Sequence, residues 1–256
     1  MKEKFSKKPA SELPENMVEG RNAVAEALKS GRTVDKVYAL SGDPDKGLAR
    51  LLAQAKQAGA VIVNVDRRKL DQMSPTGAHQ GVIASVAAHD YATLEDMLSL
   101  AERRGENPLL ILCDELSDPH NLGAILRTAE CAGAHGVIIP KRRSVGLTAV
   151  VSKTSAGALE YMPVAKVANI ANTISELKER GIWVFGTAAE GSTSLYGADL
   201  KGPTAIVIGN EGVGMSRLVA ERCDFMVSIP MKGNISSLNA SAAAAVLLYE
   251  AVRQRG

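Results

Sequence analysis

Residues 109–129 read LLILCDELSDPHNLGAILRTA, an apolar run followed by a polar turn and a second apolar segment. The apolar residues at 109–113 have the length of a buried strand, and residues 122–132 repeat apolar side chains at helical spacing. The same order returns along the chain, with strands expected over 136–139, 182–187, 205–208 and 225–229 and helices over 148–158, 170–180, 216–221 and 238–253. This alternation predicts an α/β unit with a mainly parallel sheet and helices on both faces.

A smaller α/β unit is expected upstream. Its predicted helices cover 22–28, 48–58 and 67–73, and its predicted strands cover 36–40, 61–65 and 82–87. The polar, lysine-rich segment 1–16 is predicted to be a flexible tail. Residues 91–106 are charged and amphipathic and precede Asn107-Pro108, so a link that includes a helix is expected there. The predicted domains are therefore 17–90 and 107–256, joined by residues 91–106.

The composition indicates a folded protein without a strong overall charge. Of 256 residues, 46% are hydrophobic and 23% charged, and the net charge is +2, which is ordinary for a globular chain. Basic residues cluster at 2–8, 67–69 and 141–143, where they can be solvated surface charge or local RNA contacts. Aromatic residues make up only 4%, which disfavours RNA binding through a platform of stacked aromatic rings.

The cysteines and histidines do not have the spacing of a metal site. The three cysteines are far apart, with no Cys-x-x-Cys pair, and the four histidines are scattered. We expect buried free thiols, no metal and no disulfide. The N-terminus lacks the apolar part of a secretory signal, and no apolar run is long enough to cross a bilayer. These features predict a cytoplasmic protein without a membrane segment.

Three polar segments follow predicted strands, at the edge where parallel sheets bind ligands. The first, DPHNLGAILRTA at 118–129, contains Asn121, a plausible helix N-cap, and Arg127, an arginine within an apolar helix. Alone, Arg127 can equally be an exposed residue whose stem packs on its neighbours. The second, IGNEGVGMS at 208–216, is rich in glycine but matches neither G-x-G-x-x-G nor the Walker A pattern, so it can be a ligand loop or a tight turn.

The third segment, IPMKGNISSLNAS at 229–241, leads into the last predicted helix. Ser237 or Asn239 can cap that helix. The small residues at 242–245 would let another backbone or a subunit pack closely against it.

Together these segments resemble the three motifs of the SpoU/TrmH branch of the SPOUT methyltransferases, over about residues 107–256. The segments VEGRNAV at 18–24 and HQGV at 79–82 resemble those of the small L30e-like substrate-binding domain found in some members. The two-domain layout is similar to that of the bacterial 23S rRNA guanosine-2′-O-methyltransferase subgroup. The resemblance implies transfer of a methyl group from S-adenosylmethionine to a ribose 2′-hydroxyl of RNA.

The resemblance also implies a structure and a set of site residues. It implies a deep C-terminal trefoil knot, which is a rare topology, and a homodimer with the active sites at the subunit interface. S-adenosylmethionine would contact Thr187, Ala188, Gly209, Asn210, Ile229 and Leu238. Arg127 would be the catalytic arginine, assisted by Asn121, Glu211, Ser237 and Asn239.

Two other functions stay open from the sequence. One is a tRNA 2′-O-methyltransferase of the same family, and the other is a non-catalytic RNA-binding factor in ribosome assembly. The role of Arg127 is open as well, because a guanidinium is always protonated and cannot accept a proton.

Overall fold

The computed structural model describes residues 16–188, 193–210 and 212–256. The chain divides into two compact units, Met1–Asp90 and Tyr91–Gly256, and the described part of each is taken separately.

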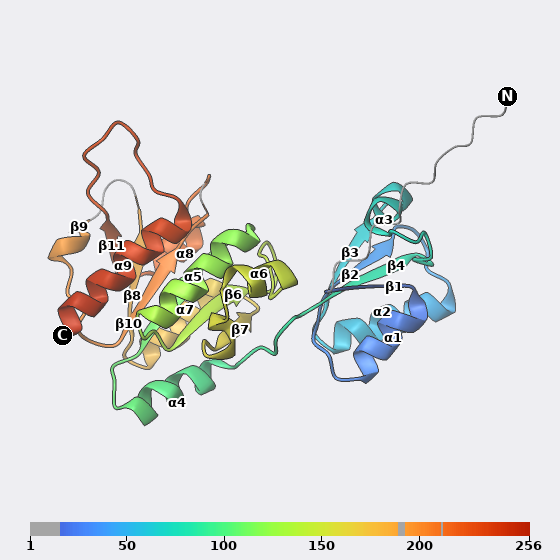
Figure 1. Ribbon diagram of the computed structural model, residues 1–256, viewed down its shortest axis with the longest axis horizontal. Helices are drawn as coiled ribbons and strands as arrows, with labels where there is room; N and C mark the ends of the chain where they lie inside the picture. Colours follow the sequence, from blue (N-terminus) through green and yellow to red (C-terminus); the bar gives the residue numbers. More distant parts are fainter. Residues whose placement is uncertain (1–15, 189–192, 211) are drawn as a thin grey trace. The chain divides into compact units, whose positions relative to one another are not determined.

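The first unit is built on a four-stranded sheet with the order β1-β4-β2-β3 (Figure 1). Strand β4 is antiparallel to β1 and β2, whereas β2 and β3 are parallel. Its elements are β1 Met17–Glu19, α1 Arg21–Lys29, β2 Val34–Leu40, α2 Lys46–Gln57, β3 Val61–Val65, α3 Arg67–Met73 and β4 Val82–Val86. The predicted helices and strands of this unit are confirmed within two residues, and β1 is an additional short strand.

The two segments that suggested the substrate-binding domain meet in this unit. Gln80 has a φ of 49°, and its carbonyl accepts a hydrogen bond from Arg21 Nε. The Arg21 guanidinium also donates to both carboxylate oxygens of Asp45, at 2.9 and 2.6 Å. The His79 ring accepts a hydrogen bond from the Gly81 N–H and so fixes the turn.

The second unit contains a seven-stranded sheet with the order β7-β6-β5-β10-β8-β11-β9, in which every strand pair is parallel. Its strands are β5 Leu109–Cys113, β6 Gly136–Pro140, β7 Val164–Val167, β8 Trp183–Thr187, β9 Thr193–Ser194, β10 Thr204–Ile208 and β11 Phe225–Ser228. Its helices are α4 Leu94–Arg104, α5 Pro119–Cys131, α6 Ala149–Thr154, α7 Ile170–Glu179, α8 Arg217–Arg222 and α9 Ala240–Arg255, with short 3-10 turns at Ala158–Glu160 and Leu195–Gly197.

Helices cover both faces of this sheet, as the sequence predicts. One core contains Leu110 and Leu112 of β5 together with residues of α4, α7 and α8. Because side chains alternate along a strand, the other face of β5 is left to α5 and α9, which pack against each other and contact β6 and β10 (Figure 1).

Several of the predictions made from the sequence are wrong in detail. Residues 91–106 are not a separate link, because Met97 of α4 is fully buried in the core of the second unit. Asp118, not Asn121, is the N-cap of α5: its carboxylate accepts from the His120 N–H at 2.9 Å, ahead of Pro119 in the first turn. Cys131 is exposed, whereas Cys113 is buried.

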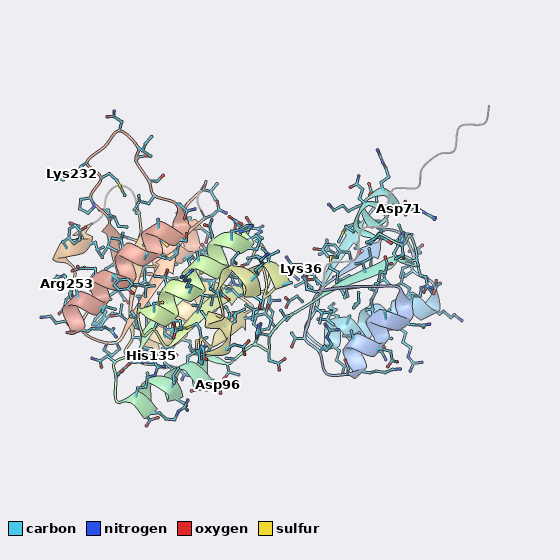
Figure 2. All side chains as sticks on the ribbon, in the orientation of Figure 1. Lys36, Asp71, Asp96, His135, Lys232 and Arg253 are labelled. Atoms are coloured by element: carbon cyan, nitrogen blue, oxygen red, sulfur yellow. The ribbon has the colours of Figure 1, made fainter. Side chains whose placement is uncertain are left out.

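The two ends of the second unit lie far apart. Figure 2 shows His135 at the end where the strands begin and Lys232, on the loop after β11, at the opposite end. Among the described residues, none of the helices combines the length and the apolar character needed to span a membrane.

Candidate cofactor pocket and active site

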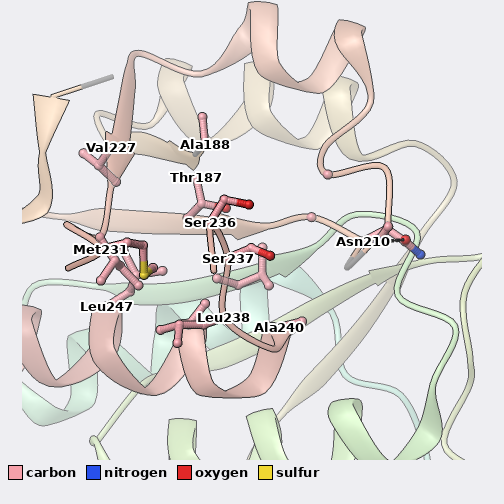
Figure 3. Close-up of a pocket in the computed structure, with 16 residues that line it drawn as sticks. Thr187, Ala188, Asn210, Val227, Met231, Ser236, Ser237, Leu238, Ala240 and Leu247 are labelled. Carbon is pink, nitrogen blue, oxygen red and sulfur yellow. Dashed lines mark hydrogen bonds between the residues drawn. The ribbon is translucent and has the colours of Figure 1, made fainter. Parts of the chain in front are cut away.

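A pocket of about 310 Å³ lies at the carboxyl ends of β8, β10 and β11, where they face the start of α9 (Figure 3). All six residues predicted to contact the cofactor line it: Thr187, Ala188, Gly209, Asn210, Ile229 and Leu238. They come from four separate segments of the chain, which parallel strands bring to one edge.

The pocket walls combine apolar and small side chains. Val227, Ile229, Leu238 and Leu247 supply apolar surface, and Ser236 and Ser237 add hydroxyl groups. Ala240 and Ala243 of α9 also line the pocket; of the small residues 242–245 predicted to allow close packing, Ala243 is the one in the lining. A flat heterocycle between aliphatic side chains, with its polar edge near loop backbone, fits such a lining.

The glycine loop bends back on itself beside the pocket. The Asn210 N–H donates to the Gly214 carbonyl at 3.0 Å, and the Gly214 N–H donates to the Asn210 carbonyl at 2.8 Å. A Cβ on Gly209 would lie 2.5 Å from both Gly214 C and Met215 N. The backbone of the loop itself therefore requires glycine at position 209, and a larger residue would affect a ligand by displacing the loop.

Residues that follow β5 anchor this loop at both of its ends. Asn210 Nδ2 donates to the Glu115 carbonyl at 3.1 Å, and the Ser216 N–H donates to Asp114 Oδ2 at 2.7 Å. Asp114 is buried, with 4% of its surface exposed. Neither Asp114 nor Glu115 was predicted from the sequence to anchor this loop. A carboxylate directly after a buried strand was a signal for Asp114, whereas Glu115 acts through its backbone carbonyl.

The first and third motifs meet through two asparagines. Asn239 caps α9 as predicted, since its Oδ1 accepts from the Ser241 and Ala242 N–H groups. Its Nδ2 donates to Asn121 Oδ1 at 2.9 Å, and Asn121 is buried in α5. This bond fixes the loop that carries Ser237 and Leu238 to the helix that carries Arg127.

The remaining predicted catalytic residues differ in their positions. Ser237 lines the pocket. Arg127 is exposed on α5 and does not line the pocket; it is six residues beyond Asn121, or about 9 Å along the helix axis. Glu211 lies outside the described residues.

The Cys113 thiol at the end of β5 is fully buried. Burial raises the pKa of the Cys113 thiol to about 12, so this residue stays protonated and is a poor nucleophile. The described ranges contain no group of three or more histidine, cysteine, aspartate or glutamate side chains arranged to hold a metal ion.

Comparison with known proteins agrees with the family resemblance of the sequence motifs over both units. The SpoU rRNA Methylase family matches residues 108–249, and the family described as RNA 2′-O ribose methyltransferase substrate binding matches residues 17–92. A Bacillus subtilis (strain 168) protein named as a TrmH family tRNA/rRNA methyltransferase, YacO, is 52% identical over 92% of this chain and 94% of its own.

Two of the similar solved structures are complexes with AdoMet. The SpoU methyltransferase AviRb from Streptomyces viridochromogenes, in complex with AdoMet, has a TM-score of 0.59 and 30% identity over 93% of this chain and 90% of its own. The AdoMet-bound rRNA methyltransferase from Sinorhizobium meliloti has a TM-score of 0.58 and 25% identity over 93% and 86%.

The fold and the pocket thus define an α/β methyltransferase that acts on RNA and uses S-adenosylmethionine. Within that class, the chain belongs to the SpoU/TrmH family. The pocket fits this cofactor, because its aliphatic walls suit an adenine ring and its glycine loop presents backbone at short range.

Proposed function

We propose that the protein methylates the ribose 2′-hydroxyl of a guanosine in 23S rRNA. The observation that carries the proposal is the convergence of Thr187, Gly209, Ile229 and Leu238 on one pocket, in a chain whose first unit matches a ribose methyltransferase substrate-binding family. The match to the rRNA methylase family, and to an rRNA methyltransferase along both units, favours rRNA as the target.

S-adenosylmethionine supplies a methyl group on a good leaving group, so the protein has to position the hydroxyl and stabilise its developing charge. We assign the charge stabilisation to Arg127. Its permanently protonated guanidinium can hold the neighbouring phosphate or the forming alkoxide. Asn121 and Asn239 act together, since their hydrogen bond sets α5 against the pocket segment. We assign Ser237 to the ribose and Glu211 to the orientation of Arg127 or a base edge.

A homodimer would explain the position of Arg127. This side chain is exposed on α5 and is not part of the pocket of its own chain, so a second copy can bring an arginine to the site. Light scattering at micromolar protein tests the dimer, and a monomer that still methylates RNA would contradict a shared site. The trefoil knot also stays a prediction; the return of the chain after β11, which brings α9 against α5, is compatible with it.

The first unit is proposed to hold the RNA. None of its described residues, 16–90, lines the pocket, and the exposed residues Arg67, Arg68 and Lys69 lie at the start of α3. Because the net charge is only +2, long-range attraction to RNA is weak and recognition has to come from local contacts.

A tRNA target is the second candidate, because the Bacillus subtilis relative is named for both kinds of RNA. The rRNA and tRNA targets are separated by mapping 2′-O-methylation on both kinds of RNA from a deletion strain, its parent strain and the complemented deletion strain. We expect one guanosine of 23S rRNA to lose its methyl group. Loss in a tRNA instead would favour the second candidate, and no loss in either would support a non-catalytic factor.

A further inference from the structure

Two residues at the carboxyl edge of the second sheet adopt a backbone conformation that is unusual for their type. Glu115, after β5, has a φ of 56°, and Arg143, after β6, has a φ of 55°. In the part of the chain that the structure describes, the only other non-glycine residues with positive φ are Gln80 and Ala156. Residues other than glycine are held in this region only when surrounding contacts fix them, and they concentrate at functional sites.

These two residues are paired, and contacts on both sides hold the segment that contains Arg143. Arg143 Nη1 lies 3.0 Å from Glu115 Oε1. The buried Ser144 hydroxyl and the Val145 N–H both donate to the Leu116 carbonyl at 3.0 Å. At the end of the segment, the Leu147 N–H donates to the Tyr91 hydroxyl at 3.0 Å. The segment is therefore a fixed part of the sheet edge.

This segment carries three adjacent positive charges, Lys141, Arg142 and Arg143. Arg142 is exposed, and 79% of the Arg143 side chain is exposed. Only one ion pair from these three side chains is present among the described residues, the pair with Glu115, whose side chain is 32% exposed. The contact with Glu115 is made by Nη1 of Arg143, so the other N–H groups of this guanidinium can donate to a phosphate while the pair is kept.

The same edge connects the basic segment to the cofactor pocket. Glu115 contacts Arg143 through its carboxylate, and its carbonyl accepts the hydrogen bond from Asn210, a pocket residue. One residue in a constrained conformation thus holds both the basic segment and the glycine loop.

We propose that Lys141, Arg142 and Arg143 form a docking surface for the phosphates of the RNA strand beside the methylated ribose, with Glu115 as a positioning residue that sets Arg143 relative to the glycine loop. This inference rests on the proposed function, in which the substrate is RNA. Two arginines suit the role, because a guanidinium binds phosphate through two parallel hydrogen bonds. A protein with a balanced net charge needs such a local cluster near its reaction site.

The test compares two variants of the full-length protein that lose the same charge. Arg142→Gln/Arg143→Gln removes the proposed surface, and Arg103→Gln/Arg104→Gln removes two exposed arginines from the last turn of α4. Binding of an in vitro transcribed 23S rRNA is measured over a series of salt concentrations. We expect the first variant to bind about 10-fold more weakly and its salt slope to fall by about 1.4 to 1.8, the value for two lost phosphate contacts. The second should behave like the unchanged protein.

Two measurements distinguish docking from damage to the pocket. Calorimetry with S-adenosylmethionine should give the same affinity for Arg142→Gln/Arg143→Gln as for the unchanged protein. Glu115→Gln keeps the carbonyl that holds Asn210 but loses the ion pair, so the KM for RNA should rise while kcat and cofactor affinity stay the same. Tighter RNA binding by Glu115→Gln would show that Glu115 competes with phosphate and would overturn its positioning role.

The outcomes also separate this inference from the proposed function. If the two double variants show equal RNA affinities and salt slopes, the docking surface is refuted, even if both proteins methylate RNA. If only Arg142→Gln/Arg143→Gln loses RNA binding but no RNA is methylated by the unchanged protein, the surface stands and the proposed function fails.

Discussion

The two edges of the second sheet both contain a cavity, and the larger cavity is not the proposed site. The carboxyl edge has the pocket of about 310 Å³ beside the glycine loop. The amino edge has a cavity of about 520 Å³ whose lining includes Glu106, His135, Lys201 and Arg255. By size and by the number of charged groups, the amino edge would be the first choice.

The difference lies in what the polar groups of each edge already bind. At the amino edge, Arg255 donates to the carbonyls of Leu200, Asn107, Pro108 and Gly202. His135 accepts from the Leu109 N–H and lies 3.0 Å from Glu106. These groups join chain segments to one another, whereas the pocket at the carboxyl edge is lined by glycines, short side chains and aliphatic groups. The chemistry of the lining, and not its volume, therefore indicates the binding site.

The largest effect is expected for Arg127. Arg127→Ala should lower the methylation rate by on the order of 10²-fold or more, because a charged partner of the transition state is lost. S-adenosylmethionine affinity should barely change, since Arg127 does not line the pocket. Single-turnover methylation and calorimetry measure the two quantities.

The matched control for this prediction is Arg103→Ala, which removes an exposed arginine from α4. It should methylate at the rate of the unchanged protein. A folded Arg127→Ala protein with near-normal turnover would exclude Arg127 from catalysis.

Replacement by alanine should affect cofactor binding differently at Gly202, which precedes β10, and at Gly209, which follows it. Gly209→Ala places a Cβ 2.5 Å from the backbone of Gly214 and Met215, whereas Gly202→Ala, at the amino edge, has open space within 4 Å. We expect Gly209→Ala to displace the glycine loop and weaken S-adenosylmethionine binding by about 10-fold or more, a loss of ~1.4 kcal/mol. Gly202→Ala should bind the cofactor normally. Equal affinities would mean that the loop does not shape the pocket.

The sequence predicted the parts of this molecule that depend on local periodicity. Strands such as β5 and β10, buried throughout, are continuous apolar runs, and their parallel order follows from the alternation with helices. Strands β7 and β9 were missed, because the first is only partly apolar and the second has two residues. The assignment of 91–106 to a link failed because amphipathic spacing shows that a helix is half-buried but not which core buries it.

The pocket residues were predicted through the family resemblance and not through periodicity. Thr187, Gly209, Ile229 and Leu238 are separated along the chain, and only the strand order brings them together. The roles of Asp114 and Glu115 could not be derived, because they depend on hydrogen bonds to a loop about a hundred residues away. The αL conformation of Glu115 likewise has no signature in a single sequence.

A change at the amino edge should affect stability and leave catalysis intact. Arg255→Met keeps the apolar stem but removes one donor from each of four carbonyl groups. The Pro108 and Gly202 carbonyls each keep a hydrogen bond from Thr204. We expect the free energy of unfolding to fall by about 1–3 kcal/mol, with S-adenosylmethionine affinity and kcat unchanged below the melting temperature. Urea denaturation measures the first quantity, and reduced cofactor affinity in the folded variant would show that the two edges are coupled.

The smallest effect concerns the pH dependence of stability at His135. Burial lowers the pKa of this imidazole, Arg104 and Arg255 lower it further, and the contact with Glu106 opposes the shift without reversing it. The geometry agrees, because Nδ1 accepts a hydrogen bond from the Leu109 N–H and must be unprotonated. The unfolded chain therefore binds the extra proton more readily than the folded one. Stability should be full above the unfolded value of about 6.5 and should decrease as the pH falls from there toward the folded pKa, by at most about 1.4 kcal/mol per pH unit.

His135→Asn, whose Oδ1 can replace Nδ1 as acceptor, should flatten this slope, whereas His120→Asn, exposed at the carboxyl edge, should leave it unchanged. Melting temperatures between pH 5 and 8 test the pair, and equal slopes in the two variants would show that the buried imidazole at the amino edge does not set the acid sensitivity of the fold.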